Sequence, residues 1–342
     1  MPTTETMDYI VCQEPGRFIL KHKEIPQRKP GEALLKINKV GICGTDIHAF
    51  SGKQPFFTYP RILGHELAAS ILEIDQHPTL KNGDGVVVMP YLNCGLCIAC
   101  RQGKANCCSN LQVLGVHTDG GMQEVISLSV DRLIPASGLS SEEMAIVEPL
   151  AIGAHAVRRA QLTAGELVAV IGCGPIGLGI LKMAQVAGTK VIALDVNEQR
   201  LQYAGNQLGV DHVVKVDHDV LSRIKEITNE DLATAVFDAT GNRKALESGV
   251  RYMSHGGRYI LVGLSKEILN FSHPEIHAKE TTIMCSRNAT REDFDHVISI
   301  LEKGLFPSNS FITHTAPYHQ MIDHFDKWLD PDSAVIKALV DF

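Results

Sequence analysis

The run VAVIGCGPIGLG, at residues 168–179, decides the fold. It places Gly172, Gly174 and Gly177 in the spacing G-x-G-x-x-G, after a short apolar stretch and before a segment of helical periodicity. A second apolar stretch follows and ends in Asp195. The glycine spacing alone is a weak signal, but in this strand–turn–helix–strand context it predicts a dinucleotide-binding unit.

Each residue of this pattern has a physical role in binding a dinucleotide. Gly172 permits the tight turn, Gly174 lets the backbone approach the pyrophosphate, and Gly177 lets helix and strand pack closely, with the diphosphate at the helix N-terminus. Asp195 can accept hydrogen bonds from a ribose 2′-hydroxyl and repels a 2′-phosphate, which favours NAD over NADP. Arg200 could stack on adenine or approach the ribose. The alternative is a glycine-rich turn that binds no nucleotide.

Around this unit, residues 151–290 alternate strand-like and helical runs. Continuous Val/Ile/Leu strands separated by helices are typical of a parallel sheet covered on both faces. We therefore predict an α/β chain with a doubly wound parallel-sheet (Rossmann) domain here. The six expected strands span residues 167–172, 190–195, 212–216, 234–240, 257–263 and 281–285.

The flanking segments have a different character. Residues 1–150 are rich in glycine, proline and cysteine, with short apolar runs between turn residues, which predicts a compact β-rich domain. Residues 291–342 contain one amphipathic helical pattern and end in the strand-like run AVIKALVDF. We expect this tail to pack back on the first domain.

Length and charge limit the possible functions. The 342 residues are enough for two domains that bury their own cores without disulfides. The N-terminus has no secretory pattern and no run reaches the roughly 18 apolar residues of a membrane span, so we expect a soluble cytoplasmic protein with reduced thiols. A net charge of −7, with both signs mixed along the chain, gives no basic face for nucleic acid. A small-molecule partner is therefore expected.

Five of the nine cysteines lie in YLNCGLCIACRQGKANCCSN, at residues 91–110. Cys94, Cys97, Cys100 and Cys108 have the spacing C-x2-C-x2-C-x7-C, and four thiolates can enclose one tetrahedral Zn²⁺ with no open position. Such a site would be structural. The alternatives are a disulfide pair, which a reducing compartment disfavours, and an iron–sulfur cluster, which a nicotinamide cofactor makes unnecessary.

A second candidate metal group is dispersed along the chain. Cys43 lies in VGICGTDIHAF, His65 and Glu66 lie in ILGHELA, and Glu148 lies in AIVEPLA. A thiolate, an imidazole and a carboxylate form a mixed shell that leaves a fourth position for water or substrate. Taken singly, each of these residues would more often be a packing residue than a ligand.

In order, these motifs resemble those of the zinc-dependent medium-chain dehydrogenase/reductase (alcohol dehydrogenase) family, on the branch of sorbitol, threonine and related polyol dehydrogenases. The resemblance covers essentially the whole chain. The pairing of GKQPFFTYP at residues 52–60 with SRNAT at residues 286–290 is most similar to the bacterial group of L-galactonate 5-dehydrogenases and starvation-sensing-protein oxidoreductases. The resemblance implies that the β-rich domain is a GroES-like catalytic domain.

The resemblance also implies two zinc ions per chain, one structural and one catalytic. Cys43 and His65 would bind the catalytic ion, and either Glu66 or Glu148 would be the third ligand, directly or through a water, with an exchange between them during turnover. The family spacing assigns the structural role to Cys108 and leaves out Cys107.

For the reaction, the resemblance implies hydride transfer from a secondary alcohol to NAD. Thr45 would take the substrate proton and His48 would pass it to solvent, as the near-neutral pKa of a histidine suits. The substrate would bind between the domains. The further residues expected at the cofactor are Ile176, Thr240, Gly241, Val262, Gly263, Leu264, Ser286 and Arg287.

The substrate is either a sugar acid or a neutral polyol. We expect an aldonate such as L-galactonate, whose carboxylate one or two cations could hold; sorbitol or another polyol is the alternative. A hypothesis of another class is a zinc-stabilised nucleotide-binding regulatory protein without turnover, which the complete set of catalytic residues disfavours. The family implies a homodimer or homotetramer. The candidate cations are Lys53, Arg61, His117 and Arg287.

Overall fold

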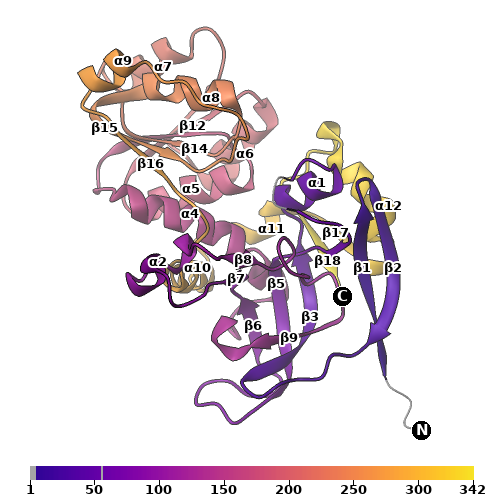
Figure 1. Cartoon of the computed structure of the whole chain (residues 1–342). Helices are drawn as coiled ribbons and strands as arrows, with labels where there is room; N and C mark the ends of the chain where they lie inside the picture. The colour runs from indigo at the N-terminus through magenta and orange to yellow at the C-terminus, as the bar shows by residue number, and fades with distance from the viewer. Residues whose placement is uncertain (1–4, 55–56) are drawn as a thin grey trace. The chain divides into compact units, whose positions relative to one another are not determined.

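The computed structural model describes residues 5–54 and 57–342 (Figure 1). The chain divides into two compact units: unit 1 is Met1–Glu148 with Thr290–Phe342, and unit 2 is Pro149–Ala289. Pro55 and Phe56, which belong to the stretch GKQPFFTYP, lie outside the described residues. Within the described part of the chain, none of the helices combines the length and the apolar character needed to span a membrane.

Unit 1 consists mainly of antiparallel strands. They are β1 (Thr6–Glu14), β2 (Arg17–Glu24), β3 (Glu32–Gly41), β4 (Arg61–Ile62), β5 (Glu66–Ile74), β6 (Gly85–Val88), β7 (Tyr91–Leu92), β8 (Gln112–Val113), β9 (Val125–Ser129), β10 (Leu133–Pro135), β17 (Ile312–Pro317) and β18 (Lys337–Asp341). The largest sheet has the order β10-β6-β5-β3-β18-β17, with β9 also paired to β3, and the smaller sheets are β2-β1-β4 and β7-β8. The β-rich GroES-like fold predicted for this part is confirmed.

The C-terminal segment is part of the core of unit 1. β18 pairs antiparallel with β3, where Val340 lies opposite Val40. Phe325 of α12 packs edge-on against Phe18, with ring centroids 4.9 Å apart, inside the same cluster of buried residues. The helices of this unit are α1 (Gly44–Phe50), α2 (Ile98–Arg101), α3 (Ser141–Ala145), α10 (Arg291–Glu302), α11 (Ser308–Phe311) and α12 (Tyr318–Leu329).

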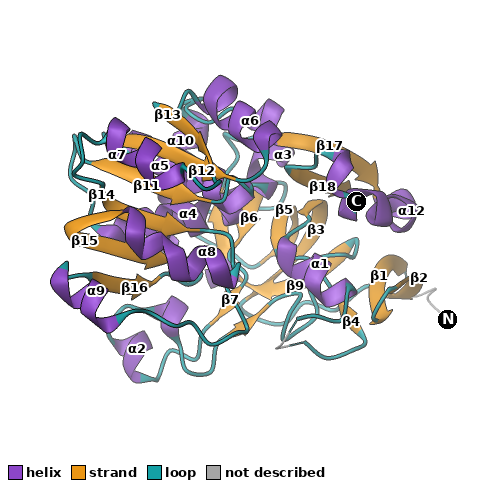
Figure 2. Cartoon of the chain, turned by 90° about the horizontal axis from the view of Figure 1, so that it is seen from above, coloured by secondary structure: helices purple, strands orange, loops and turns teal. Residues whose placement is uncertain are grey.

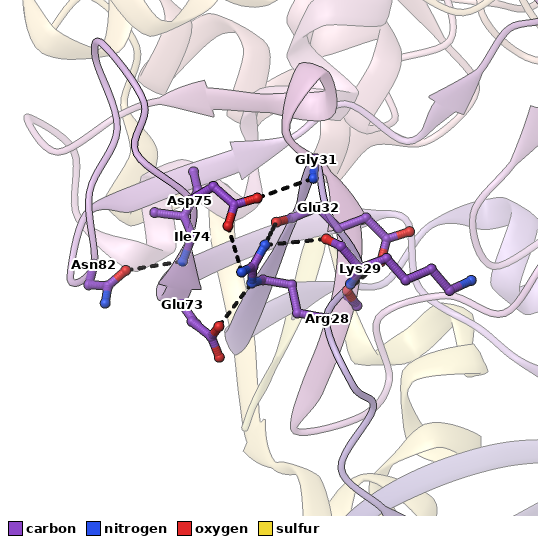
Figure 3. A network of polar contacts seen from close by, with 9 residues as sticks. Arg28, Lys29, Gly31, Glu32, Glu73, Ile74, Asp75 and Asn82 are labelled. Carbon is purple, nitrogen blue, oxygen red and sulfur yellow. Dashed lines mark hydrogen bonds and ion pairs between the residues drawn. The ribbon is translucent and has the colours of Figure 1, made fainter.

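At one end of the β3–β5 pair, Arg28 ties the loop before β3 to the end of β5 (Figure 3). Its guanidinium donates to Glu73 Oε1 at 3.0 Å, to Asp75 Oδ1 at 2.7 Å and to the carbonyl of Glu32 at 3.2 Å. Both acidic partners are more than half exposed, so the network fixes strand ends and adds little to stability. The opposite end of the same strand pair forms the candidate metal site.

Unit 2 is a six-stranded parallel sheet in the order β13-β12-β11-β14-β15-β16, which can be followed from edge to edge in Figure 2. The strands are β11 (Leu167–Ile171), β12 (Lys190–Asp195), β13 (His212–Lys215), β14 (Ala233–Asp238), β15 (Met253–Leu261) and β16 (Thr282–Cys285). Its helices are α4 (Val147–Ala160), α5 (Pro175–Val186), α6 (Glu198–Leu208), α7 (Val220–Ile227), α8 (Arg243–Ser248) and α9 (His273–Ala278). Figure 1 shows α4 and α5 on one side of this sheet and α7 and α8 on the other. The predicted doubly wound fold is confirmed.

β15 differs most from its predicted range, while the other strands agree within two residues at each end. β15 begins at Met253, four residues before the expected start, and ends at Leu261. It ends early because the N–H groups of Val262 and Gly263 both donate to the carbonyl of Asp238, at 2.9 Å, which turns the chain out of the sheet. The additional residues at the start of β15 lead into two consecutive glycines, Gly256 and Gly257. On sequence alone, such a pair indicates a turn.

Candidate metal and cofactor sites

The four cysteines at residues 94, 97, 100 and 108 form one compact group. Their sulfur atoms all lie within 4.8 Å of one another, and every cysteine of the described chain is a free thiol. The Sγ atoms of Cys97 and Cys100 are 3.5 Å apart, and those of Cys94 and Cys108 are 3.4 Å apart. Cys107 is exposed and does not belong to the group. This arrangement fits a closed structural zinc site with four thiolate ligands.

Backbone N–H groups donate hydrogen bonds to sulfur atoms of this group. The N–H of Cys94 donates to Cys108 Sγ at 3.2 Å, and the N–H of Cys97 donates to Cys94 Sγ at 3.4 Å. Hydrogen bonds from the backbone of Cys100 and Ser109 lower the pKa of Cys97 to about 5. Since the thiolate is the form that binds zinc, these hydrogen bonds favour the binding form of Cys97, whereas the pKa of Cys108 is raised to about 11.

The dispersed group is brought together by the other end of the β3–β5 pair. Cys43 follows β3 and caps α1, His65 directly precedes β5, and Glu66 is the first residue of β5. A thiolate sulfur, an imidazole nitrogen and a carboxylate oxygen from these residues lie within 4.8 Å of one another. Glu148, the other expected carboxylate, is buried at the start of α4 but does not belong to this group. The three side chains present fit a zinc site with an open position.

Two glycines make this close approach possible. Gly41 lies opposite Glu66 in the register of β3 and β5, and a Cβ at Gly41 would lie 2.0 Å from Glu66 Oε2. Gly64 has a φ of +92°, and a Cβ there would lie 2.7 Å from Val40 Cγ1. A side chain at Gly41 would therefore displace Glu66, and one at Gly64 would clash with Val40 and strain the backbone next to His65.

Asp46 supports two of the ligands from the first turn of α1. It is completely buried, and its carboxylate accepts hydrogen bonds from the N–H groups of Cys43 at 2.9 Å and Gly64 at 3.3 Å. Its Oδ1 lies 3.9 Å from Nδ1 of His65. Burial alone would lower the pKa of His65, but the charges of Cys43 and Asp46 raise it well above its usual value. The sequence analysis did not identify Asp46.

Lys337 is a second residue that the sequence analysis missed. It lies on β18 and is buried, and its Nζ lies 2.8 and 2.7 Å from the two carboxylate oxygens of Glu66 and 3.0 Å from the carbonyl of Ile42. Burial alone would lower the pKa of Lys337, but the charges of Glu66 and Cys43 raise it. The ammonium therefore balances negative charge at the metal group.

Tyr91 is the third such residue. Its hydroxyl donates a hydrogen bond to Oε1 of Glu148, and both side chains are buried. Burial raises the pKa of Glu148, an effect that the nearby His65 opposes. Burial and the Glu148 charge raise the pKa of Tyr91 well above its usual value.

The residues expected in proton transfer lie on α1. Thr45 is half-buried and His48 is exposed. They are three positions apart on the helix, which puts them on one face. Among the candidate cations, Arg61 already pairs with Asp119 at 3.4 Å and donates to Thr58, while Lys53 is exposed.

In unit 2, the glycine turn has the geometry that the sequence predicts. Gly172 has a φ of +92°, and a Cβ at Gly177 would lie 1.7 Å from the carbonyl oxygen of Gly172. At Gly174 the nearest atom to a Cβ would be an Arg200 nitrogen, 3.9 Å away, so the space there is open. α5 begins directly after Gly174, with Ile176 in its first turn. The turn fits a diphosphate at a helix N-terminus.

Asp195 supports this turn as well as ending β12. Its Oδ2 accepts a hydrogen bond from the N–H of Cys173 at 2.6 Å, and its Oδ1 accepts one from the N–H of Asn197 at 2.8 Å. A carboxylate has about four lone-pair sites, so it can still accept from a ribose hydroxyl. Arg200 is exposed and lies near the same turn.

The strand ends place the remaining cofactor candidates at one edge of the sheet. Ile171, Asp238, Leu261 and Cys285 are level with one another in β11, β14, β15 and β16. The segments that follow them therefore leave the sheet beside the glycine turn, where open α/β sheets bind ligands. They contain Thr240, Gly241, Val262, Gly263, Leu264, Ser286 and Arg287.

Comparisons with known families agree with both units. The description "Alcohol dehydrogenase GroES-like domain" matches residues 29–138, and "Zinc-binding dehydrogenase" matches residues 175–303. The chain is 41% identical to L-galactonate-5-dehydrogenase of Escherichia coli (strain K12) over 98% of this chain and 99% of that protein. It is 32% identical to sorbitol dehydrogenase of Bacillus subtilis (strain 168) over 92% of each chain.

A solved structure extends the comparison to the whole fold. The crystal structure of the alcohol dehydrogenase RspB from E. coli CFT073, in complex with NADH, matches with a TM-score of 0.92 at 30% identity. The match covers 98% of this chain and 99% of that chain.

Proposed function

The chain belongs to the zinc-dependent medium-chain alcohol dehydrogenase family, and from this premise we propose that it oxidises a secondary hydroxyl of an aldonate such as L-galactonate to a keto acid, with NAD as hydride acceptor. As a family member it is a zinc-dependent alcohol or polyol dehydrogenase. The observation that carries the reaction type is the mixed donor group of Cys43, His65 and Glu66, whose ligand atoms lie within 4.8 Å of one another. Such a group keeps a coordination position open.

The side chains around this group have separate tasks in the proposed reaction. A bound zinc ion would supply a Lewis acid that favours ionisation of the alcohol. Thr45, half-buried, would accept the hydroxyl proton of the substrate, and His48, exposed on the same helix face, would release it to solvent. Lys337 would hold Glu66 in place through both carboxylate oxygens.

For the cofactor, we propose NAD bound by the glycine turn and the strand ends of unit 2. Asp195 supports this choice because its charge would repel a 2′-phosphate while its oxygens can accept from a 2′-hydroxyl. Arg200 is the feature that favours NADP, since its guanidinium lies near the turn. We also propose a homodimer or homotetramer, as is common in this family.

A neutral polyol is the second candidate substrate, supported by the similarity to sorbitol dehydrogenase. Arg61 is already engaged by Asp119 and Thr58, which reduces its value as a carboxylate anchor. Lys53 is an exposed cation that could serve this purpose.

The test is NADH absorbance with L-galactonate and with galactitol, which differs from it by a hydroxymethyl group in place of the carboxylate. We expect kcat/KM to favour L-galactonate by about 100-fold, from a charge-assisted contact worth roughly 3 kcal/mol. The same samples should contain two zinc ions per chain and turn over NAD faster than NADP. Equal rates on both substrates, or a higher rate on sorbitol, would favour the polyol; faster turnover of NADP would contradict the role of Asp195.

A further inference from the structure

The hydrogen bond between Tyr91 and Glu148 is a connection that neither the sequence motifs nor the proposed reaction explains. Tyr91 is 4% exposed and Glu148 is 4% exposed, so water does not replace either partner easily. Among the described residues, the Tyr91 hydroxyl is the one hydrogen-bond donor to this carboxylate. Removing it would leave a buried carboxylate without its donor.

Two backbone contacts and one ring contact position Tyr91. Tyr91 pairs with Val113 across β7 and β8, and its carbonyl accepts a hydrogen bond from Nη1 of Arg132 at 2.7 Å. Its ring packs edge-on against Phe294 of α10, with the centroids 6.2 Å apart. These contacts place the hydroxyl next to Glu148, to which it donates.

The two buried carboxylates of the site have different partners. Glu66 has both oxygens bound by the Lys337 ammonium and belongs to the metal group with Cys43. Glu148 has one oxygen bound by a neutral hydroxyl and stands outside that group, although its charge acts on His65. A neutral donor sets the direction of a carboxylate without neutralising it.

We propose that Tyr91 is a positioning residue of the active site: its hydroxyl holds one oxygen of Glu148 and so sets the orientation of this carboxylate relative to the Cys43–His65–Glu66 group. This inference rests on the proposed function for the metal in the dispersed group. The Tyr91 hydroxyl donates its hydrogen bond to Oε1, which restricts rotation of the carboxylate and sets the direction of Oε2.

The test uses protein reconstituted with cobalt(II), whose visible d–d bands report the ligand set. In Tyr91→Phe, the bands of the dispersed site should shift and its cobalt should pass to a chelator about tenfold faster, while the thiolate bands of the four-cysteine site stay unchanged as an internal reference. Oxidation of the alcohol should fall about tenfold in kcat with little change in the KM for NAD. Tyr259→Phe is the matched control, because it removes a buried hydroxyl that donates to the carbonyl of Leu246 in unit 2.

Two outcomes would overturn the proposal. The first is a folded Tyr91→Phe protein with wild-type bands and release rate, which would make Tyr91 a packing residue. The second is an undiminished tenfold effect of Tyr91→Phe in a Glu148→Gln background, since a residue that acts through Glu148 should then have no further effect. If Tyr91→Phe does not fold, unchanged cobalt bands in Glu148→Gln alone would contradict the placement of Glu148. The cobalt measurements need no substrate, so they stand or fail independently of the aldonate assay.

Discussion

The two metal groups of unit 1 are assembled in opposite ways. The four cysteines come from residues 94–108, and their sulfurs are held by local turns and backbone N–H groups. The dispersed group takes ligands from the end of β3 and the start of β5, and its balancing ammonium comes from β18. The first group is therefore local in sequence. The dispersed group depends on the folded sheet and is supported by the buried ion pair between Lys337 and Glu66.

The two metal groups are also expected to have different roles, one structural and one catalytic. A closed shell of four thiolates leaves no position for substrate, so it can stabilise but cannot catalyse. A mixed group of three donors leaves a position open and is surrounded by further buried charges, which is typical of a catalytic site. Damage to the first group should thus appear in stability, and damage to the second in activity.

The largest effect is expected from Cys43→Ser. Loss of the thiolate should remove the metal from the dispersed group and lower kcat/KM by at least about 1,000-fold, equivalent to roughly 4 kcal/mol. The zinc content should fall from two ions to one per chain, while the thermal midpoint changes little. Kinetics and inductively coupled plasma measurements on one preparation test this; activity within tenfold of the wild type would contradict the assignment.

Cys108→Ser should show the reverse pattern. Loss of one of four thiolates should release the structural zinc and destabilise unit 1 by about 3 kcal/mol, which lowers Tm by roughly 10 °C. The second zinc should remain. Cys107→Ser is the matched control, because Cys107 is exposed and lies outside the group. If Cys107→Ser loses zinc and Cys108→Ser does not, the ligand assignment is wrong.

The same contrast explains which features the sequence could predict. The glycine turn and the four cysteines are short-range patterns, since a few neighbouring residues contain both the ligands and the backbone that positions them. The strands of unit 2 were predictable because parallel buried strands are continuous apolar runs. β15 was predicted too short because Gly256 and Gly257 indicate a turn on sequence alone.

Lys337 and Tyr91 could not be assigned in this way. Lys337 meets Glu66 across 271 positions of the chain, and Tyr91 meets Glu148 across 57, so no local spacing indicates either contact. The one signal for Lys337 was a charged residue inside the apolar run AVIKALVDF. A buried charge of this kind requires a partner, but the sequence does not say which one.

Lys337→Met should give the smallest measured change of the three variants. It tests directly whether the ion pair supports the dispersed metal group. Without the ammonium, Glu66 is buried and unpaired unless a metal is bound, so the zinc-depleted protein should lose about 3 kcal/mol and the zinc-loaded protein less. The difference in Tm between the two forms should therefore widen by several degrees relative to the wild type. Lys39→Met is the matched control, because Lys39 lies on β3 of the same sheet, pairs with Asp341 and Glu142, and does not belong to the metal group. Calorimetry with and without a chelator measures both differences; an equal gap in wild type and Lys337→Met would mean that the ion pair does not support the metal group.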